Sequence, residues 1–371
     1  MAINKKRVVY LFGAGASQAE ASLESDSVSL LMSNIKDGIY KKISNIKTGG
    51  VRELINELAG ENVDVEQLIT LYESSGNKKH KRFSKLLKKY FREEIQEQIS
   101  KLDKGGRFSP NLYSALIDMH EIEDFDEELM GIMTLNYEDL IERAVKRVKG
   151  AVNYSFELTK TPIGTKIDGI LVLKLHGSFN WRNEFPISLR DNIKEEEDIL
   201  WIPPGVEKHR EKYPFNIIWG KAQELLDCDI LRIVGCSLSQ NDWHLVSLLY
   251  TTQKLNRNAK EYIIEIINCP LSEGEETREI WGEEDISKKY PHLRIKQIYE
   301  LQEIREFVLT SLYKLAPDRE QIEIDNKTIS NYLAKSNVFD IWLRAKGEDI
   351  KSRGIKLTTS SNIFNDYIEE A

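Results

Sequence analysis

One junction near the N-terminus constrains the fold most, because an apolar run there ends in a glycine-rich turn. Residues 7–17 read RVVYLFGAGAS, so the run from Val8 to Phe12 leads directly into Gly13. Short uninterrupted apolar runs are typical of strands that are buried on both faces of a parallel sheet. A strand followed by G-x-G and a helix can hold a pyrophosphate on backbone N–H groups. A plain tight turn explains the same residues equally well.

Further along the chain, strand-like and helical segments alternate. Strand patterns occur at residues 130–134, 170–177, 230–235, 262–268 and 293–299. This alternation predicts an α/β fold with a doubly wound parallel sheet. Ligands of such sheets bind at the carboxyl ends of the strands, so residues at those ends are the candidates for a site.

Residues 25–125 differ from the rest, because their apolar residues recur with helical spacing and strand patterns are missing. They predict an all-helical insertion module within a nucleotide-binding domain formed by residues 1–24 and 126–317. The basic run from Lys78 to Arg92 carries its apolar residues on one helical face. This arrangement favours a solvated helix with a core stripe over a nucleic-acid patch.

The pattern of residues 318–371 predicts a C-terminal helical extension. We expect this extension to be either a docking element or a loosely attached terminus. Its helix carries an apolar stripe, and we predict that this stripe is exposed and marks a contact with another chain. The residues of the stripe are Val338, Phe339, Ile341, Trp342 and Leu343.

Composition excludes several classes of protein. The net charge of −8 disfavours an autonomous or sequence-specific nucleic-acid binder, since phosphate binding requires an excess of Lys and Arg. The cysteines Cys228, Cys236 and Cys269 form no CxxC pair, so we expect no zinc site or other metal site and no disulfide framework. The apolar run after Arg7 is too short for a signal peptide, and no run is long enough to span a membrane. We therefore expect a cytoplasmic protein.

Polar side chains follow the strand at 130–134. Thr134 and Asn136 lie where this strand gives way to a helix, and the acids Glu138 and Asp139 come next. A helix cap at Asn136 and acids in the first helical turn explain this segment without a ligand. Hydroxyl and amide groups at a strand end are also what a ribose site requires.

His176 ends the next strand, directly before a glycine. A buried histidine is more often a satisfied core residue than a functional one. Its place at a strand end favours a role in the site. Gly235 ends the strand at 230–235 and Ser237 follows it, and Asn268 ends the strand at 262–268.

In their order along the chain, these motifs resemble the sirtuin superfamily. The resemblance is closest to the sirtuin-like branch of bacterial antiphage defence systems, and it spans about residues 7–300. The segments that carry it are DVEQL (64–68), GAGAS (13–17), TLNYEDLIE (134–142), LHGSFNW (175–181), IPPG (202–205), GCSLSQND (235–242) and INCP (267–270). The resemblance implies a sirtuin-like Rossmann fold with an all-helical inserted module.

The resemblance also implies roles for residues in an NAD⁺ site. Asn136 would lie beside the nicotinamide ribose, and His176 would be the catalytic histidine. The binding residues would be Gly13, Ala14, Gly15, Ser17, Thr134, Glu138, Asp139, Gly235, Ser237 and Asn268. The first four would hold the phosphates, and Ser237 and Asn268 the adenosine half. The family's acid after the TxNx segment is Asp, and both Glu138 and Asp139 remain candidates for its place.

Two departures from sirtuin deacylases bear on the function. Deacylases follow the GAG turn with a GIPxFR segment, whereas residues 18–22 read QAEAS here. Deacylases also carry a four-cysteine zinc module, and three scattered cysteines cannot supply one. The resemblance therefore implies an NAD⁺ hydrolase (NADase) that releases nicotinamide and ADP-ribose, rather than an NAD-dependent protein deacylase. A non-catalytic NAD or ADP-ribose sensor is the alternative from another class.

The resemblance implies a function in antiphage defence by abortive infection, in which NAD⁺ is depleted. Such an enzyme must be held inactive until infection. The resemblance to short sirtuin-like defence proteins implies a homo-oligomer that is controlled by a HerA-type hexameric ATPase or translocase, with a short Argonaute as the second candidate.

Overall fold

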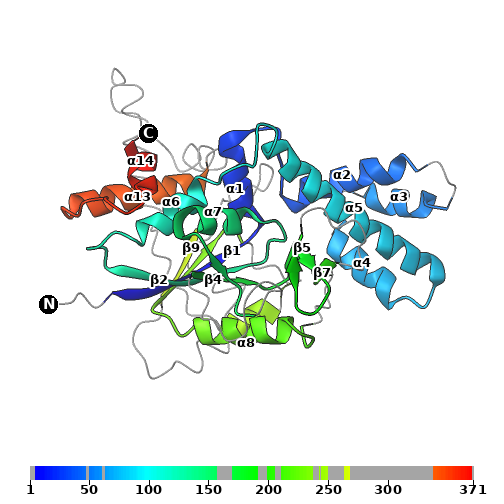
Figure 1. The fold of residues 1–371 in the computed structure, drawn as a ribbon. Coiled ribbons are helices and arrows are strands. Elements are labelled where there is room, and N and C mark those ends of the chain that lie inside the picture. Colours follow the sequence, from blue (N-terminus) through cyan, green and yellow to red (C-terminus); the bar gives the residue numbers. More distant parts are fainter. Residues whose placement is uncertain are drawn as a thin grey trace, which may run out of the picture.

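The computed structural model describes residues 5–46, 50–60, 63–156, 169–190, 199–204, 210–236, 242, 244–249, 263–267 and 337–369. Its strands are β1 (Lys6–Phe12), β2 (Glu127–Thr134), β3 (Val152–Asn153), β4 (Ile170–Lys174), β5 (Gly177–Arg182), β6 (Ser188–Leu189), β7 (Ile199–Trp201), β8 (Ile230–Val234) and β9 (Ile263–Ile267). Its helices are α1 (Ala14–Glu24), α2 (Met32–Ser44), α3 (Arg52–Leu58), α4 (Val65–Ser74), α5 (Lys78–Leu102), α6 (Leu112–Met119), α7 (Leu140–Lys149), α8 (Phe215–Leu225), α13 (Val338–Ser352) and α14 (Ile363–Glu369). The arrangement is drawn in Figure 1.

Six parallel strands form the central sheet, in the order β3-β4-β2-β1-β8-β9. The chain starts at β1, builds outward through β2 and β4, and later returns to the other side of β1 with β8. The order of the strands thus reverses at β1, where a doubly wound sheet opens to its ligand. This topology confirms the predicted α/β fold with a doubly wound parallel sheet.

Both faces of the sheet are covered, as the apolar run of β1 predicts. Val8, Tyr10 and Phe12 point into one buried cluster, whereas Val9 and Leu11 point into another. Helices α1, α6, α7 and α13 lie on the first face and α8 on the second (Figure 1). A strand that alternates between two dry faces needs apolar residues at every position.

The carboxyl ends of five strands lie level with one another. The pairings place one residue of each strand in a single row: Ile267, Val234, Phe12, Thr134 and Lys174. The residues just beyond continue the hydrogen bonding, since Leu135 N donates to Phe12 O at 3.0 Å and Leu175 N donates to Thr134 O at 2.9 Å. The segments that carry the predicted site residues therefore leave the sheet at the same edge.

The described residues between 25 and 125 contain helices and one isolated bridge between Lys104 and Gly106, and no strand. Helices α2 to α5 extend to one side of the sheet (Figure 1). On α5, Phe83 and Leu87 are buried, and Leu86 and Tyr90 pack partly buried against the core. This confirms the core stripe of the basic helix. Where the chain divides into domains remains a prediction.

The segment around His176 differs from the predicted single strand at 170–177. Strand β4 ends at Lys174, and β5 begins at Gly177 in a separate antiparallel sheet, β6-β5-β7. Gly177 has φ of +77°, and a Cβ there would lie 2.5 Å from Leu200 O. The chain therefore turns sharply at Leu175 and His176, which requires glycine at the next position. The strand predicted at 293–299 lies outside the described residues.

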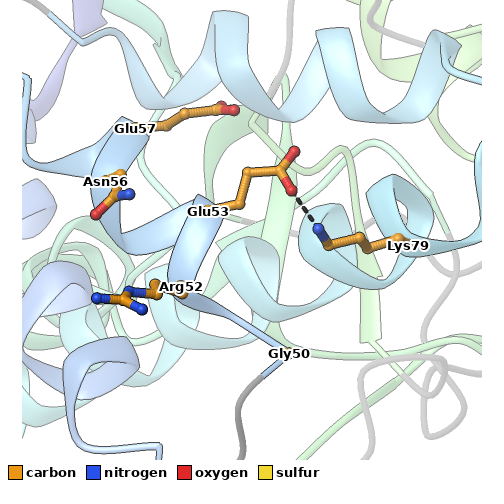
Figure 2. Close-up of a pocket in the computed structure, with 6 residues that line it drawn as sticks. All are labelled: Gly50, Arg52, Glu53, Asn56, Glu57 and Lys79. Carbon is orange, nitrogen blue, oxygen red and sulfur yellow. Dashed lines mark hydrogen bonds and ion pairs between the residues drawn. The ribbon is translucent and has the colours of Figure 1, made fainter.

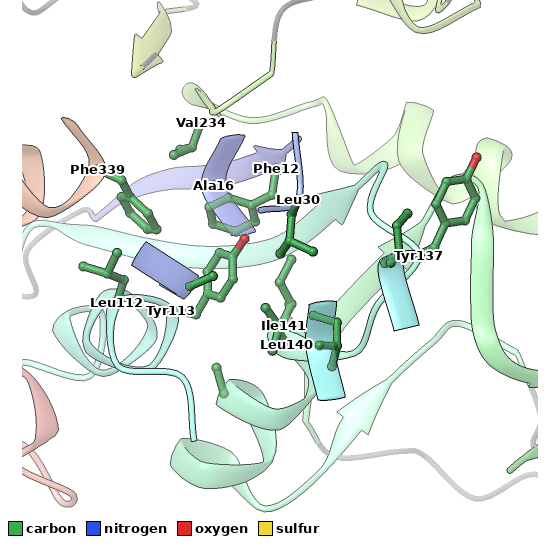
Figure 3. Packing of buried hydrophobic residues seen from close by; sticks show 14 of the residues in the cluster. Phe12, Ala16, Leu30, Leu112, Tyr113, Tyr137, Leu140, Ile141, Val234 and Phe339 are labelled. Carbon is green, nitrogen blue, oxygen red and sulfur yellow. The ribbon is translucent and has the colours of Figure 1, made fainter. Parts of the chain in front are cut away.

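The prediction of an exposed apolar stripe on the C-terminal helix is wrong. Its five apolar residues are between 0% and 9% exposed, because they pack on the chain's own sheet. The ring of Trp342 lies 6.4 Å from that of Tyr10. The ring of Phe339 lies 6.0 Å from that of Phe12, and Figure 3 shows these two side chains. The stripe is therefore part of the core, and it gives no support to an oligomer contact.

Candidate functional site

The glycines of the first turn are required by the turn after β8. A Cβ on Gly13 would lie 2.6 Å from Gly235 O, and one on Gly235, whose φ is +60°, would lie 2.0 Å from Ala16 N. Gly13 N donates to Val234 O at 3.0 Å and Gly15 N to Gly235 O at 2.8 Å. The N–H groups of Gly13 and Gly15 are therefore already hydrogen-bonded to β8 and its turn. The phosphate contact predicted for these two residues would have to use other groups.

Asn136 is fixed by its amide nitrogen, which donates to Gly13 O at 3.0 Å and to Ser17 Oγ at 2.8 Å. Because Gly13 O can only accept, the atom that faces it must be the NH₂ group. Its backbone N–H donates to Thr134 Oγ1 at 3.0 Å. Both amide hydrogens are thus used within the protein, and the side chain has only its oxygen to offer to a ligand.

Glu138 is the acid that joins this cluster. It is buried, and its Oε1 accepts a hydrogen bond from Ser17 Oγ. Its Oε2 is buried and has no hydrogen-bond partner among the described residues. Burial raises the pKa of this carboxyl, although Lys174 and Ser17 act against the shift. A buried carboxylate oxygen without a donor is unfavourable, so a donor from a ligand would be stabilising here.

A second acid and a lysine lie beneath this cluster. The ammonium of Lys174 is fully buried, donates to Glu138 O and lies 2.9 Å from Glu142 Oε1. Burial also raises the pKa of Glu142, with Lys174 acting against it. Two buried carboxyl groups, those of Glu138 and Glu142, therefore lie near a single buried cation.

Asp139 faces away from the cluster. Its carboxylate pairs with Arg107 at 2.6 Å and with Arg143 at 2.8 Å. Arg143 in turn pairs with Asp103 at 2.7 Å. Between the two acids that follow the TxNx segment, the structure thus places Glu138 against Ser17 and Asn136, and Asp139 in a separate ion-pair network.

His176 lies at the end of the neighbouring strand and is 5% exposed. Its carbonyl accepts from Ile202 N at 2.8 Å, and its ring lies 6.0 Å from the ring of Tyr137. Its Nε2 lies 3.6 Å from Oδ1 of Asp242. The hydroxyl of Tyr137 donates to Ile202 O at 2.9 Å.

The remaining predicted residues have different positions. Ala14 is exposed at the first position of α1. Ser237 and Asn268 lie outside the described residues. Among the described residues, no group of three His, Cys, Asp or Glu side chains could hold a metal ion, and Cys228 and Cys236 are separate and buried.

Sequence reasoning missed several residues of this site. Lys174 had a detectable signal, because a lysine within an apolar strand must find a buried partner. Asp242 belongs to the GCSLSQND segment but was given no role. Tyr113, whose hydroxyl lies 3.0 Å from Ser17 Oγ, comes from α6 and had no sequence signal.

A hollow elsewhere in the molecule does not belong to this site. It lies between α3 and α5 and is lined by Gly50, Arg52, Glu53, Asn56, Glu57 and Lys79 (Figure 2). Glu53 and Lys79 form an ion pair across it. Its lining comes entirely from the helical segment, so it is distinct from the carboxyl edge of the sheet.

One protein family matches part of the chain. Residues 131–287 match the SIR2-like domain. The matched segment is less than half of the chain, and it contains Asn136, Glu138, His176 and Gly235. The sirtuin-like character predicted from the motifs is confirmed for these residues. No helix in the described part of the chain is long and apolar enough to cross a membrane.

Solved structures and curated proteins add little to this match. The structure of a mutant Sir2 homologue in complex with ADP ribose is 16% identical, with a TM-score of 0.33, over 85% of this chain and 95% of the other. One titled "The Structural basis of Sirtuin Substrate Affinity" is 16% identical, with a TM-score of 0.32, over 82% and 93%. No curated protein is similar enough to match the chain.

Proposed function

We propose that this chain binds NAD⁺ at the carboxyl edge of β1, β2 and β4 and hydrolyses it to nicotinamide and ADP-ribose. The observation that carries the proposal is the buried cluster of Ser17, Asn136 and Glu138. These three residues follow two neighbouring strands at the point where the order of the sheet reverses, which is where such folds bind ligands. The match of residues 131–287 to the SIR2-like domain supports NAD⁺ as the ligand.

The hydrogen-bonding capacity of the cluster fits a ribose. Asn136 offers only its amide oxygen, and Glu138 offers an Oε2 that no described residue satisfies. Both are acceptors, and the hydroxyl groups of a ribose are donors. A ribose seated here would satisfy the buried carboxylate oxygen, which gives binding a local driving force.

The charges of the cluster fit the reaction. Cleavage of the bond between nicotinamide and ribose develops positive charge on the sugar, as in glycoside hydrolysis. Glu138 and Glu142 supply two carboxyls against the single cation of Lys174. The cluster therefore carries net negative charge when both acids are ionised, and a preorganised negative charge stabilises a cationic transition state.

Water is the nucleophile in this proposal, since the chain lacks the zinc module and the GIPxFR segment of the deacylases. NAD⁺ and one water give nicotinamide, ADP-ribose and one proton. His176 would accept that proton from the attacking water, or from a ribose hydroxyl that relays it. Asn136 would orient the ribose or the water through its amide oxygen.

The test is to incubate the purified chain with NAD⁺ and to measure free nicotinamide, with and without candidate partners. Release of nicotinamide in step with ADP-ribose supports hydrolysis. Tight binding of NAD⁺ or ADP-ribose without turnover under every condition would instead favour a non-catalytic sensor. Turnover that requires an acyl-lysine peptide would favour a deacylase.

We further propose a setting for this activity, which rests on the motif resemblance to defence proteins. The chain would act in the cytoplasm in antiphage defence by depleting NAD⁺. It would form a homo-oligomer, and a HerA-type hexameric ATPase would switch it on, with a short Argonaute as the second candidate. Light scattering of the chain alone and mixed with each candidate tests the assembly, and nicotinamide release tests activation. A monomer in every mixture contradicts this part.

A further inference from the structure

The side chain of His176 lies close to a carboxylate from a different part of the chain. Asp242 follows the turn after β8, whereas His176 follows β4 on the other side of β1 and β2. We infer that Asp242 is the positioning residue for His176, holding its ring and balancing the charge that His176 gains when it accepts a proton. This inference rests on the proposed function for its role in the reaction, but the pair itself can be tested separately.

The geometry brings His176 and Asp242 within the range of an ion pair once the ring is protonated. His176 Nε2 and Asp242 Oδ1 are 3.6 Å apart, and the two side chains are 6% and 14% exposed. This distance is too long for a hydrogen bond in the structure as it stands. Charges at this separation still attract strongly when little water is present, so the carboxylate favours the protonated ring.

Tyr137 and Trp219 are two other described groups near this part of the chain, and neither carries a carboxylate. The buried hydroxyl of Tyr137 has its pKa raised by burial, with smaller contributions from Glu66 and Asp242. Trp219 donates to Leu175 O at 3.1 Å, next to His176 in the chain. The ring of His244 lies 6.5 Å from that of Trp219, and the guanidinium of Arg210 lies 5.2 Å from it. Asp242 is the described acid for which a contact with the imidazole is seen, at 3.6 Å.

The proposal needs one tautomer of the neutral ring, because Nε2 is the nitrogen that faces Asp242. With its hydrogen on Nε2, the ring points that hydrogen at Asp242 and has its lone pair on Nδ1. Nδ1 then accepts the proton from water or a ribose hydroxyl, and the imidazolium that forms lies beside a carboxylate. The proton afterwards leaves to solvent, and Asp242 takes no part in its transfer, as in other histidine–carboxylate pairs.

The first experiment follows the ring of His176 by NMR as a function of pH. The chain has six histidines, and the signal that disappears in His176→Gln identifies the right one. In Asp242→Asn, which removes the charge at nearly constant shape, the titration midpoint of His176 should fall by roughly one pH unit or more. Asp242→Glu keeps the charge and should return the midpoint toward that of the wild type.

Matched variants keep this test decisive. Asp227→Asn removes an exposed carboxylate that pairs with Arg7 instead, and it should leave the midpoint unchanged. If Asp242→Asn does not fold, Asp242→Ser removes the same charge with a smaller side chain. An unchanged His176 midpoint in a folded variant without the charge overturns the inference, whether or not the chain hydrolyses NAD⁺.

The second experiment measures kcat/KM for NAD⁺ cleavage against pH. Loss of Asp242 should move the acid limb to lower pH, because a less basic His176 stays unprotonated there, and it should lower the plateau. A merely structural role would lower the amount of active protein without moving the limb. A wild type that shows no turnover refutes the proposed function, and the NMR titration still decides the pair.

Discussion

The hydroxyl of Tyr113 lies 3.0 Å from the hydroxyl of Ser17, and it joins helix α6 to the candidate site. Ser17 donates its one hydrogen to Glu138, so the hydroxyl of Tyr113 must donate to Ser17. Together with the amide of Asn136, Ser17 thus has one acceptor and two donors around it. A residue from the helical segment thereby fixes the direction of the hydrogen bond between Ser17 and Glu138.

Replacing Tyr113 by Phe should lower NAD⁺ turnover while the fold stays intact. The ring would keep its packing against Phe12, whose centroid is 4.9 Å away, and only the donor to Ser17 would be lost. Loss of one hydrogen bond costs about 1 kcal/mol, so kcat should fall about five- to tenfold with the melting temperature little changed. Nicotinamide release and a thermal melt measure both. Wild-type turnover in the variant contradicts a role for this contact.

Helix α13 is predicted to be essential for stability. Trp342 is buried over Arg232, whose guanidinium lies 5.2 Å from its ring, and Arg232 is bound by Glu127 and Glu265. Trp342→Ala should therefore lower the free energy of unfolding by about 3–5 kcal/mol. Urea denaturation measures this loss. Phe185→Ala, at a side chain that is 82% exposed, is the control and should change stability little.

If α13 were instead mainly a contact between chains, Trp342→Ala would change the oligomeric state and leave the stability of the monomer intact. Light scattering beside the denaturation curve separates these outcomes.

The sequence predicted the sheet well because buried parallel strands have an unusual pattern. The run from Val8 to Phe12 and the run from Ile230 to Val234 are apolar at nearly every position, and few other structures need that. Arg232 is the exception within the second run. It is tolerated because two acids and a tyrosine surround it, and these come from strands far away in the sequence.

Part of the candidate site could also be predicted from the parallel sheet. Asn136 and His176 could be placed from strand ends, because parallel strands bring their carboxyl ends to one edge. The choice between Glu138 and Asp139 could not be made, since neighbouring residues point in different directions and only tertiary contacts decide which is buried. The apolar stripe of α13 misled for a similar reason, because a helix that covers a sheet and a helix that binds a partner have the same pattern.

Stability should depend on pH through Glu20. Burial raises the pKa of this carboxyl to about 7, although it accepts hydrogen bonds from the backbone of Asn111, Leu112 and Tyr113. The folded state thus binds a proton that the unfolded state releases at lower pH. The contribution of Glu20 to the free energy of unfolding is present in full below the unfolded pKa and is lost as pH rises to about 7.

Glu20→Gln tests this by removing the titration. Between acidic and neutral pH, the free energy of unfolding of the wild type should fall by up to about 3 kcal/mol relative to that of the variant. Urea denaturation at a series of pH values measures that slope, and any constant cost of the glutamine cancels from it. A slope of the opposite sign contradicts the effect of burial.

The last prediction concerns Asn136 and His176 acting together. Their strands pair in register, with Thr134 opposite Lys174, so each side chain follows its strand by two residues at the same edge. Asn136→Ala and His176→Ala should each reduce NAD⁺ cleavage at least about 100-fold in folded protein. If both act on one ribose and its water, the double variant should be little worse than either single one, because groups that act as a unit are not additive.

The measurement is nicotinamide release by the activated protein, normalised to folded material by a thermal melt. A histidine with a purely structural role leads to the opposite result, in which His176→Ala melts at a lower temperature and keeps its turnover per folded molecule. Because Asn136 binds Gly13 and Ser17, its loss also carries a stability cost, and the normalisation removes that cost from the comparison. Full turnover in well-folded His176→Ala would exclude this histidine as the base and favour a site that binds NAD⁺ without cleaving it.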